Sequence, residues 1–577
     1  MSRRMKKIIF IAIIGWVILS ILGIFSFFVG NDPSTKEDAE LSEIEARVEQ
    51  MTVKEKVGQL LMPAIREVDN EPVTNMQPEI KQMIDEYTPG GIVLFRENVQ
   101  SRQQLKLLIS KLQEESEIPL LMSIDQEGGL VTRLSYFPDL PGNMALGATA
   151  DRSLVKEAGQ IIGKELHSLG IHIDFAPAVD INVNPLNPVI GIRSFGDDPK
   201  QVAKMGTAFM DGLNEAGVMA VAKHFPGHGG VASDSHYVLP VNPNSIEELR
   251  NSELKPFQAM IDEDVQGVMT AHITFPNIET TQLASKKDGL PVHVPATLSP
   301  RMINELLREE MRFDGLVFTD AMDMKAISDH FGPGEAAVRT ILAGADIIVM
   351  PEHLKVAYDS LIEAVESKRV TEKRLNKSVM RILKAKQKFI DANTADLSEG
   401  STIEEVIQLE KKIAEQSITV LKNDQVLPLE EKFEGSIAIV SSDNQLLNAM
   451  KNAMWGHHYQ FELVRIDSLK NQNGKLTEDQ IGQLEQSALT LFVSESPTIV
   501  GYGENAWELA TLKDAQKYSQ DTVLVMARNP YDLTVLPEVD VAIAQYSTES
   551  ASFQATADVI FGEKEAFGTL PVQIPTR

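Results

Sequence analysis

The chain has 577 residues and a formal net charge of −28, with 43 % hydrophobic residues, 24 % charged residues and no cysteine. This length exceeds what one hydrophobic core usually organises, so two globular domains are expected. The acidic balance excludes nucleic acid as the main partner, because phosphate binding needs clustered lysine and arginine. The lack of cysteine excludes disulfides, a thiol nucleophile, thiolate metal ligands and a lipidated cysteine anchor.

The N-terminus predicts a membrane anchor. Four basic residues in MSRRMKK precede 23 uncharged positions, residues 8–30, a length that spans a bilayer as a helix. No Ala-x-Ala sequence follows, which favours an uncleaved transmembrane helix over a signal peptide. The basic flank should stay in the cytoplasm, so a polar tether (residues 31–45) and everything beyond it are expected outside a bacterial cell. The alternative is cleavage and secretion.

Short apolar runs alternate with segments of helical spacing between residues 46 and 396. Apolar strands that alternate with helices indicate a parallel sheet covered on both faces. Eight such units predict an α/β fold with an N-terminal (β/α)8 TIM-like barrel, and an open doubly wound sheet is the alternative. The eight runs are residues 57–65, 90–95, 119–125, 172–181, 217–224, 267–275, 315–322 and 345–351.

A second α/β pattern follows the first. Residues 397–416 are expected to form a linker and a helix. Residues 417–577 then predict a C-terminal three-layer α/β/α sandwich domain, because strands again alternate with helices. Its five expected strands are residues 417–423, 436–442, 489–495, 522–528 and 539–547.

Polar side chains follow the apolar runs of the first domain where each run ends. In a barrel the active site lies at the C-terminal ends of the strands. Scattered surface charge would not gather at one end of the strands, so these residues are candidates for a common site. They are Asp125, Gln126, Glu127, Asp180, Asn182, Lys223, His224, His272 and Asp320, with Arg193 in a loop beyond.

The loop KHFPGHGGVASDSH, residues 223–236, is the richest in ionisable groups. Its Asp234 and His236 stand two positions apart, so in an extended loop they share a face. An aspartate so placed can hold the imidazole in one tautomer and stabilise its protonated form, which makes the histidine a general acid/base.

Asp320 directly follows the apolar run LVFT, so the strand is expected to aim its carboxylate into the barrel mouth. A carboxylate there serves as a nucleophile, a general base or a metal ligand. The alternative is a cap on the following helix, for which Asp323 is the better placed residue.

No metal and no cofactor are expected. His224, His228 and His236 do not form an H-E-x-x-H motif, and Lys223 beside them would repel a cation. The GHGG sequence also lacks the spacing of a nucleotide-binding loop. A polyhydroxylated ligand suits the remaining groups better, because buried polar side chains discriminate between such ligands. For the arginines among them, structural salt bridging is the alternative. These groups are Asp125, Arg133, Arg193, Lys223 and His224.

Several long motifs in the expected order resemble glycoside hydrolase family 3, and more narrowly its bacterial β-N-acetylglucosaminidases, the beta-hexosaminidase type. The resemblance covers residues 50–390. The second domain resembles the C-terminal domain of the family through SITVLKNDQVLPL and VIFGEKEAFGTLPVQIP. The motifs of the first domain are DQEGGLVTRL (125–134), DFAPAVDI (174–181), NPVIGIRSFG (187–196), KHFPGHGGVASDSH (223–236) and FTDAMDM (318–324).

The resemblance implies a role for each matching position. Asp320 would be the nucleophile of a retaining double displacement, and His236 the acid/base with Asp234 as its partner. Leu130 departs from the family pattern, since many relatives carry arginine there. The residues implied to hold the N-acetylglucosamine ring are Asp125, Arg133, Arg193, Lys223 and His224.

The resemblance predicts an exo-β-N-acetylglucosaminidase that removes terminal non-reducing N-acetylglucosamine from peptidoglycan-derived saccharides or muropeptides. One alternative is a phosphorylase on the same fold, since a histidine acid/base tolerates phosphate where a second carboxylate would repel it. The other is a non-catalytic surface protein that binds saccharides.

Overall fold

The computed structural model describes residues 33–391, 399–429, 435–457, 459–471, 473–495, 506–536 and 538–575. The predicted span, residues 8–30, lies outside them. No helix in the described ranges is long and apolar enough to cross a membrane. The transmembrane helix of the predicted fold class and the single-pass membrane localisation are therefore corrected. The first helix described, α2 (Pro33–Gln50), is rich in charged residues.

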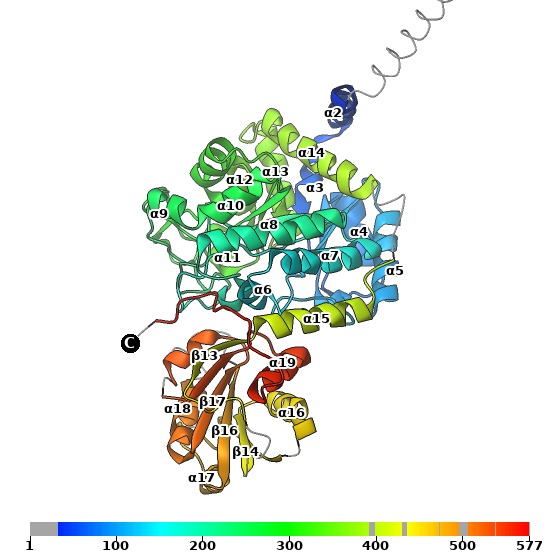
Figure 1. Cartoon of the computed structure of the whole chain (residues 1–577). Helices are drawn as coiled ribbons and strands as arrows, with labels where there is room; N and C mark the ends of the chain where they lie inside the picture. Colours follow the sequence, from blue (N-terminus) through cyan, green and yellow to red (C-terminus); the bar gives the residue numbers. More distant parts are fainter. Residues whose placement is uncertain are drawn as a thin grey trace, which may run out of the picture.

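The two-domain α/β part of the predicted fold class agrees with the structure (Figure 1). Eight parallel strands form a closed ring in the first domain. Six strands pair in sequence, and β1 and β12 complete the ring through bridges from Ala64 to Val93 and from Phe318 to Ile347. The strands are β1 (Leu61–Met62), β4 (Gly91–Leu94), β5 (Leu121–Ile124), β6 (Ile173–Asp174), β7 (Met219–Phe225), β8 (Gly267–Thr270), β11 (Leu316–Thr319) and β12 (Ile348–Val349).

Each strand lies within one of the eight expected apolar runs or extends it by one residue, but most strands are shorter than their runs. Residues 57–59 belong to helix α3 (Val53–Gln59) and not to a strand. The strand positions are mostly apolar because both faces of the strands are buried. Along β7, Met219 and Val221 pack in one hydrophobic cluster, whereas Ala220 and Ala222 pack in the other.

Helices surround the ring of strands. Several begin at side-chain caps, which satisfy N–H groups that have no partner inside a helix. Ser101 and Gln104 form a capping box on α5, and Asp151 accepts from two backbone N–H groups of α7. The covering helices are α4 (Pro78–Tyr87), α5 (Arg102–Glu114), α7 (Arg152–Leu169), α8 (Pro199–Glu215), α10 (Leu254–Asp262), the helical segment Arg301–Glu310, α12 (Pro333–Ala343), α13 (Leu354–Glu366) and α14 (Glu372–Lys386).

Shorter elements lie in the connections between strands and helices. The helix α11 comes after Asp320, the residue that follows β11, and α9 comes after the loop of residues 223–236. These elements are α6 (Asn143–Thr149), α9 (Ile246–Asn251), α11 (Lys325–Phe331) and the hairpins β2 (Glu67–Val68) with β3 (Glu71–Pro72) and β9 (Gln282–Ala284) with β10 (Pro291–His293).

The second domain has one six-stranded sheet in the order β13-β18-β17-β16-β14-β15. All neighbours are parallel except β13, which runs antiparallel to β18. One strand, β15, was not expected, because it is a partly exposed edge strand without a continuous apolar run. The strands are β13 (Thr419–Asn423), β14 (Ser436–Ser441), β15 (Gln460–Arg465), β16 (Ser487–Ser494), β17 (Asp521–Met526) and β18 (Val541–Ala544).

Helices cover both faces of this sheet. On β14, Ile437 and Ile439 face the cluster that contains α16 (Asn444–Ala453) and α19 (Ser550–Ile560). Ala438 and Val440 face the opposite side, where Leu484 of α17 and Leu512 of α18 pack. The remaining bounds are α17 (Glu478–Glu485), α18 (Ala506–Ala515) and α15 (Ile403–Ser417), which leads from the barrel into the sheet.

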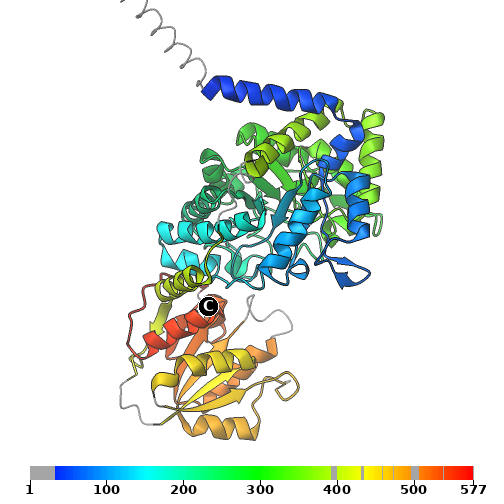
Figure 2. The ribbon, with the colours of Figure 1, turned by 90° about the vertical axis from the view of Figure 1, so that its right-hand side faces the viewer.

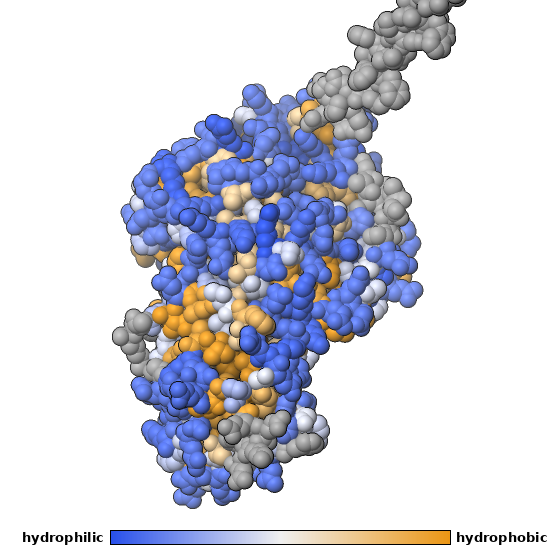
Figure 3. All heavy atoms as spheres, viewed as in Figure 1, coloured by the Kyte–Doolittle hydropathy of each residue, from blue (hydrophilic) through white to orange (hydrophobic). Residues whose placement is uncertain are grey.

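The second domain packs against the end of the barrel where the strands finish (Figures 1 and 2). The Thr569 N–H donates to the Ala148 carbonyl at 2.8 Å, and the Asp197 N–H donates to the Pro571 carbonyl at 3.0 Å. Helix α2 lies at the opposite end of the barrel. Figure 3 shows a mostly hydrophilic surface, with hydrophobic residues gathered on the second domain toward the barrel.

Candidate active site

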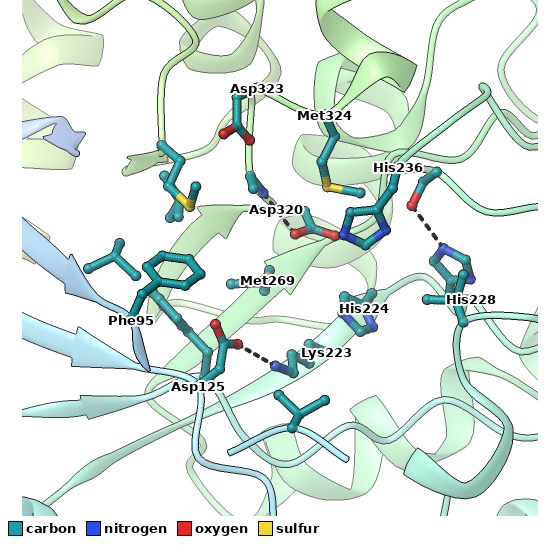
Figure 4. A pocket seen from close by; sticks show the side chains of 18 of the residues that line it. Phe95, Asp125, Lys223, His224, His228, His236, Met269, Asp320, Asp323 and Met324 are labelled. Atoms are coloured by element: carbon teal, nitrogen blue, oxygen red, sulfur yellow. Dashed lines mark hydrogen bonds and ion pairs between the residues drawn. The ribbon is translucent and has the colours of Figure 1, made fainter. Parts of the chain in front are cut away.

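A cavity of about 370 Å³ opens at the C-terminal ends of the barrel strands. The described residues that line it all come from the barrel, between Arg66 and Met350. Of the eight site residues expected from the sequence, seven line this cavity, and Asp234 contacts one of the seven. Figure 4 shows five of the seven around the cavity: Asp125, Lys223, His224, His236 and Asp320. The seven are Asp125, Arg133, Arg193, Lys223, His224, His236 and Asp320.

One cluster on the floor of the cavity, which we call the clamp, consists of two carboxylates and two cations: Asp125, Glu127, Arg193 and Lys223. Glu127 and Lys223 are buried, and Asp125 and Arg193 are partly buried. Lys223 Nζ lies 2.8 Å from Asp125 Oδ1 and 2.6 Å from Glu127 Oε1. The Arg193 guanidinium donates two hydrogen bonds to Glu127, at 2.7 and 3.0 Å. The structural salt bridging considered for Arg193 is thus present, and it leaves Arg193 on the cavity wall.

Within the clamp, each charged group offsets the effect of burial on the pKa of its oppositely charged neighbour. Burial alone would raise the pKa of Glu127, but Arg193 and Lys223 outweigh it and hold that pKa well below its usual range. Burial would lower the pKa of Lys223, whereas Asp125 and Glu127 raise it above its ordinary value. Glu127 and Lys223 are therefore both charged at neutral pH, and their ion pairs fix the geometry of the clamp.

Glu127 was one of the polar residues expected at this end of the strands, but no role in the site was assigned to it from the sequence. Its side chain is only 1 % exposed, and both of its cationic partners line the cavity. The signal in the sequence that pointed to Glu127 was its position, as a polar residue two positions after Asp125. The partners lie 66 and 96 positions further along the chain, so the pairing could not be read from local sequence.

Arg133 is held more loosely than Arg193. Its guanidinium lies 3.7 Å from Asp125 Oδ2 and 5.3 Å from the centre of the Phe95 ring. Arg66 lies over the same ring at 4.7 Å. Phe95 and Arg66 were not expected from the sequence, and together with Arg133 they make an aromatic and cationic wall.

His224 is oriented by Asp180, which is fully buried behind it. The imidazole Nδ1 lies 2.7 Å from Asp180 Oδ2, and the His224 backbone N–H donates to the same carboxylate. Burial would raise the pKa of Asp180, but His224 and His228 hold it below its usual value, so the carboxylate is ionised and accepts from Nδ1. The other ring nitrogen, Nε2, remains for a ligand. His224 lies inside β7 and not after its end.

Asp320 follows the last residue of β11 and lines the cavity. The Ala321 N–H donates to Asp320 Oδ1 at 2.7 Å. Burial would raise the pKa of this carboxyl, but the positive potential of His224 and His272 and the Ala321 N–H outweigh it and lower the pKa. Asp320 is therefore ionised at neutral pH, as a nucleophile requires.

Asp323 does not cap the helix that follows. Helix α11 begins at Lys325 with Met324 at the capping position, and no side chain bonds to its first turn. Instead Asp323 lines the cavity near Asp320. Burial and the charge of Asp320 raise the pKa of Asp323 above its usual value.

His236 and Asp234 form a hydrogen-bonded pair on the loop above the cavity. His236 Nδ1 lies 2.8 Å from Asp234 Oδ1, which also accepts from the His236 backbone N–H at 2.8 Å. The hydrogen bond to Asp234 raises the pKa of His236, and this outweighs the lowering by burial. The His236 side chain is 59 % exposed, so water and a leaving group can reach it.

The histidines and acidic residues around the cavity are not arranged as metal ligands. Among the described residues, no group of three or more histidine and acidic side chains is arranged to hold a metal ion. His224 and His236 each use Nδ1 on a carboxylate, and Lys223 occupies the space between the acids of the clamp.

The fold and the relatives define the class of this protein, the glycoside hydrolases. The chain belongs to glycosyl hydrolase family 3, and it is a glycoside hydrolase of the beta-hexosaminidase type. The Glycosyl hydrolase family 3 N terminal domain matches residues 52–385, and the Glycosyl hydrolase family 3 C-terminal domain matches residues 418–577. Both the family expected from the motifs and the prediction of an enzyme are confirmed.

Individual relatives agree with this assignment. Over 551 residues the chain is 32 % identical to beta-hexosaminidase A of Pseudoalteromonas piscicida, covering 87 % of this chain and 92 % of that protein. It is 28 % identical to the beta-N-acetylglucosaminidase/beta-glucosidase of Cellulomonas fimi, covering 84 % and 88 %. The solved family 3 beta-N-acetylglucosaminidase from Paenibacillus sp. str. FPU-7 superposes with a TM-score of 0.78 at 36 % identity, covering 91 % and 99 %.

Proposed function

We propose that this protein is a retaining exo-β-N-acetylglucosaminidase that works through a covalent glycosyl intermediate on Asp320. One observation carries the proposal: Asp320 and the Asp234–His236 pair face the same cavity, beside the clamp. The names of the relatives support N-acetylglucosamine as the sugar. The cavity of about 370 Å³ suits one sugar ring, which favours removal of terminal residues.

In the first step the Asp320 carboxylate attacks the anomeric carbon of the bound sugar. The bond from this carbon to the glycosidic oxygen breaks, and protonated His236 gives its Nε2 proton to that oxygen. Asp234 accepts from Nδ1 and stabilises the charged imidazole before the transfer. The products of this step are the free aglycone and a glycosyl ester on Asp320.

In the second step a water molecule hydrolyses the ester. Neutral His236 takes a proton from the water, whose oxygen bonds to the anomeric carbon while Asp320 leaves as a carboxylate. Two displacements restore the original anomeric configuration. A histidine serves both steps without placing a second carboxylate opposite the nucleophile, where two negative charges would repel each other.

We propose that the clamp, with Arg133 and His224, holds the sugar ring. Asp125 would accept from hydroxyl groups of the ring, and Lys223 and Arg193 would donate to its substituents, since these three side chains line the cavity. Peptidoglycan-derived fragments are the source that we propose for the substrate. The support is the positive charge of Arg66 on the cavity wall, which would favour an aglycone that carries a carboxylate, such as muramic acid.

The test is to trap the intermediate. A 5-fluoro-N-acetylglucosaminyl fluoride should inactivate the enzyme, and mass spectrometry of the digested protein should find the sugar on the peptide that contains Asp320. A label on any other residue contradicts the assigned nucleophile.

Product analysis separates the proposal from its alternatives. In phosphate buffer a hydrolase releases N-acetylglucosamine, whereas a phosphorylase releases N-acetylglucosamine 1-phosphate and depends on the phosphate concentration. A protein that binds N-acetylglucosamine but turns over neither an aryl glycoside nor a disaccharide would instead be a binding protein.

Asp234→Asn is expected to move the alkaline limb of the kcat/KM profile to lower pH. His236 must be protonated in the first step, so activity is present below its pKa and lost above it. The charge of Asp234 raises that pKa, and asparagine removes the charge. Activity at pH 7 should fall by about 10- to 100-fold. The acidic limb, set by the lowered pKa of Asp320, should stay in place, and an unmoved alkaline limb would contradict the role of Asp234.

A further inference from the structure

The loop that carries His236 is held down at a point that the mechanism above does not use. We propose that His228 and Ser235 form a latch that positions the Asp234–His236 pair over the cavity. The inference rests on the proposed role of His236 as the acid/base, and it assigns two further positioning residues to the same reaction.

Ser235 is the buried anchor of an otherwise accessible segment. It is 1 % exposed, whereas the side chains of its neighbours Asp234 and His236 are 25 % and 59 % exposed. The Ser235 hydroxyl lies 3.3 Å from His228 Nε2, an interaction that is drawn beside His228 in Figure 4. The Ser235 carbonyl accepts from the Ala326 N–H at 3.3 Å. One residue therefore ties the pair to the base of its own loop and to α11, which follows Asp320.

The other half of the latch is rigid. The His228 backbone N–H donates to Asp180 Oδ1 at 2.6 Å, and its carbonyl accepts from Asn187 Nδ2 at 2.7 Å. Its ring packs edge-on against His224, with ring centres 5.8 Å apart. Asp180 thus orients His224 in the cavity and also fixes the residue to which Ser235 is attached.

His228 is suited to a neutral hydrogen bond and not to proton transfer. Burial lowers the pKa of His228 to about 4, so the ring is neutral at neutral pH. His228 Nδ1 has no hydrogen-bond partner among the described residues, which leaves the Ser235 hydroxyl as the polar partner of the ring. A single hydrogen bond between neutral groups is modest in strength, so the latch can open and close during turnover.

The chain between the two halves, residues 229–234, contains two glycines, Gly229 and Gly230. A Cβ at Gly230 would lie 3.2 Å from Asn242 Nδ2 and 3.4 Å from Glu253 Oε1. Two buried polar atoms beside the loop, Asn242 Nδ2 and Glu253 Oε2, have no partner among the described residues. Spare donors and acceptors at this point can pair with the loop backbone when the latch is open.

Loss of the latch should lower turnover most for substrates whose leaving group needs a proton from His236. If Ser235 is released, the loop spends less time with His236 above the glycosidic oxygen. A poor leaving group, such as the second sugar of chitobiose, needs the proton, whereas 4-nitrophenolate leaves with little help. The clamp is untouched, so substrate affinity should change little.

Ser235→Ala is the direct test. We expect kcat/KM for chitobiose to fall by about tenfold and kcat/KM for 4-nitrophenyl N-acetyl-β-glucosaminide by less than about threefold, with KM nearly constant. Ser235→Thr keeps the hydroxyl and should recover most of the loss on chitobiose. Ser233→Ala is the matched control, since this serine belongs to the same loop and does not line the cavity.

The double variant keeps the test decisive. If the latch exists, kcat/KM for chitobiose should be nearly the same in the double variant His228→Ala, Ser235→Ala as in His228→Ala alone. The reason is that either substitution breaks the same contact. Provided that the wild-type protein is active, three results would overturn the latch. They are fully additive losses of kcat/KM in the double variant, equal losses of Ser235→Ala on both substrates, and no loss of Ser235→Ala on either substrate. Wild-type protein that is inactive on both substrates would overturn the proposed function, and the latch with it.

Discussion

Asp320→Ala is expected to lower kcat/KM for 4-nitrophenyl N-acetyl-β-glucosaminide by at least about 10⁴-fold with the fold intact. Alanine removes the atom that would form the bond to the anomeric carbon, and a good leaving group does not compensate for a missing nucleophile. Asp320 takes part in no ion pair of the barrel core among the described residues, and its hydrogen bond is to the adjacent Ala321. Its loss should therefore not unfold the barrel.

Steady-state kinetics with circular dichroism and thermal melting check this result. Asp320→Asn is the matched variant, because it preserves the shape of the side chain and removes only the charge. Azide added to Asp320→Ala should restore turnover and release the α-glycosyl azide, since a single displacement inverts the anomeric centre. Near-normal turnover of Asp320→Ala without azide would exclude Asp320 as the nucleophile.

His236→Ala has the second largest expected effect. Turnover of chitobiose should fall by about 10²- to 10⁴-fold, because the departing sugar hydroxyl must be protonated. Formation of the glycosyl-enzyme from an activated aryl glycoside should fall by about tenfold or less, since 4-nitrophenolate leaves without a proton. Pre-steady-state release of 4-nitrophenol measures this step separately from hydrolysis of the intermediate.

Azide provides the positive control for His236→Ala. The anion needs no general base, so it should speed breakdown of the intermediate and release the β-glycosyl azide, the product of two displacements. His353→Ala is a suitable negative control, because His353 is exposed and does not line the cavity. Equal losses of His236→Ala on both substrates, with no effect of azide, would contradict its role as the acid/base.

Most of the barrel could be predicted from the chain itself. A parallel strand buried on both faces needs a continuous apolar run, and such runs mark β5 and β11 clearly in the sequence. The edge strand β15 was missed because its outer positions are exposed, which breaks the run. The membrane anchor was corrected: length and lack of charge at residues 8–30 suggested a span, but none of the helices described is long and apolar enough to cross a membrane.

Local sequence was sufficient for features that neighbours in the chain determine. The end of an apolar strand placed Asp320 at the cavity, and a spacing of two positions brought Asp234 and His236 into hydrogen-bond contact. Asp320 is adjacent to its strand, and one residue separates Asp234 from His236. Such short stretches of backbone leave the side chains little freedom of position.

Only the tertiary structure decided which distant residues meet. Glu127 pairs with Arg193 and Lys223, and Asp180 holds His224 and His228, because strand order brings these loops to one end of the barrel. It also decided that Ser235 is buried between two exposed neighbours and that Asp323 faces the cavity and not a helix end. The sequence alone determined the barrel and the candidate chemistry. The residues that pair with the site side chains, and so set their charge and position, were decided by closure of the ring of strands. A local sequence pattern shows that a side chain is polar but not which group it will contact.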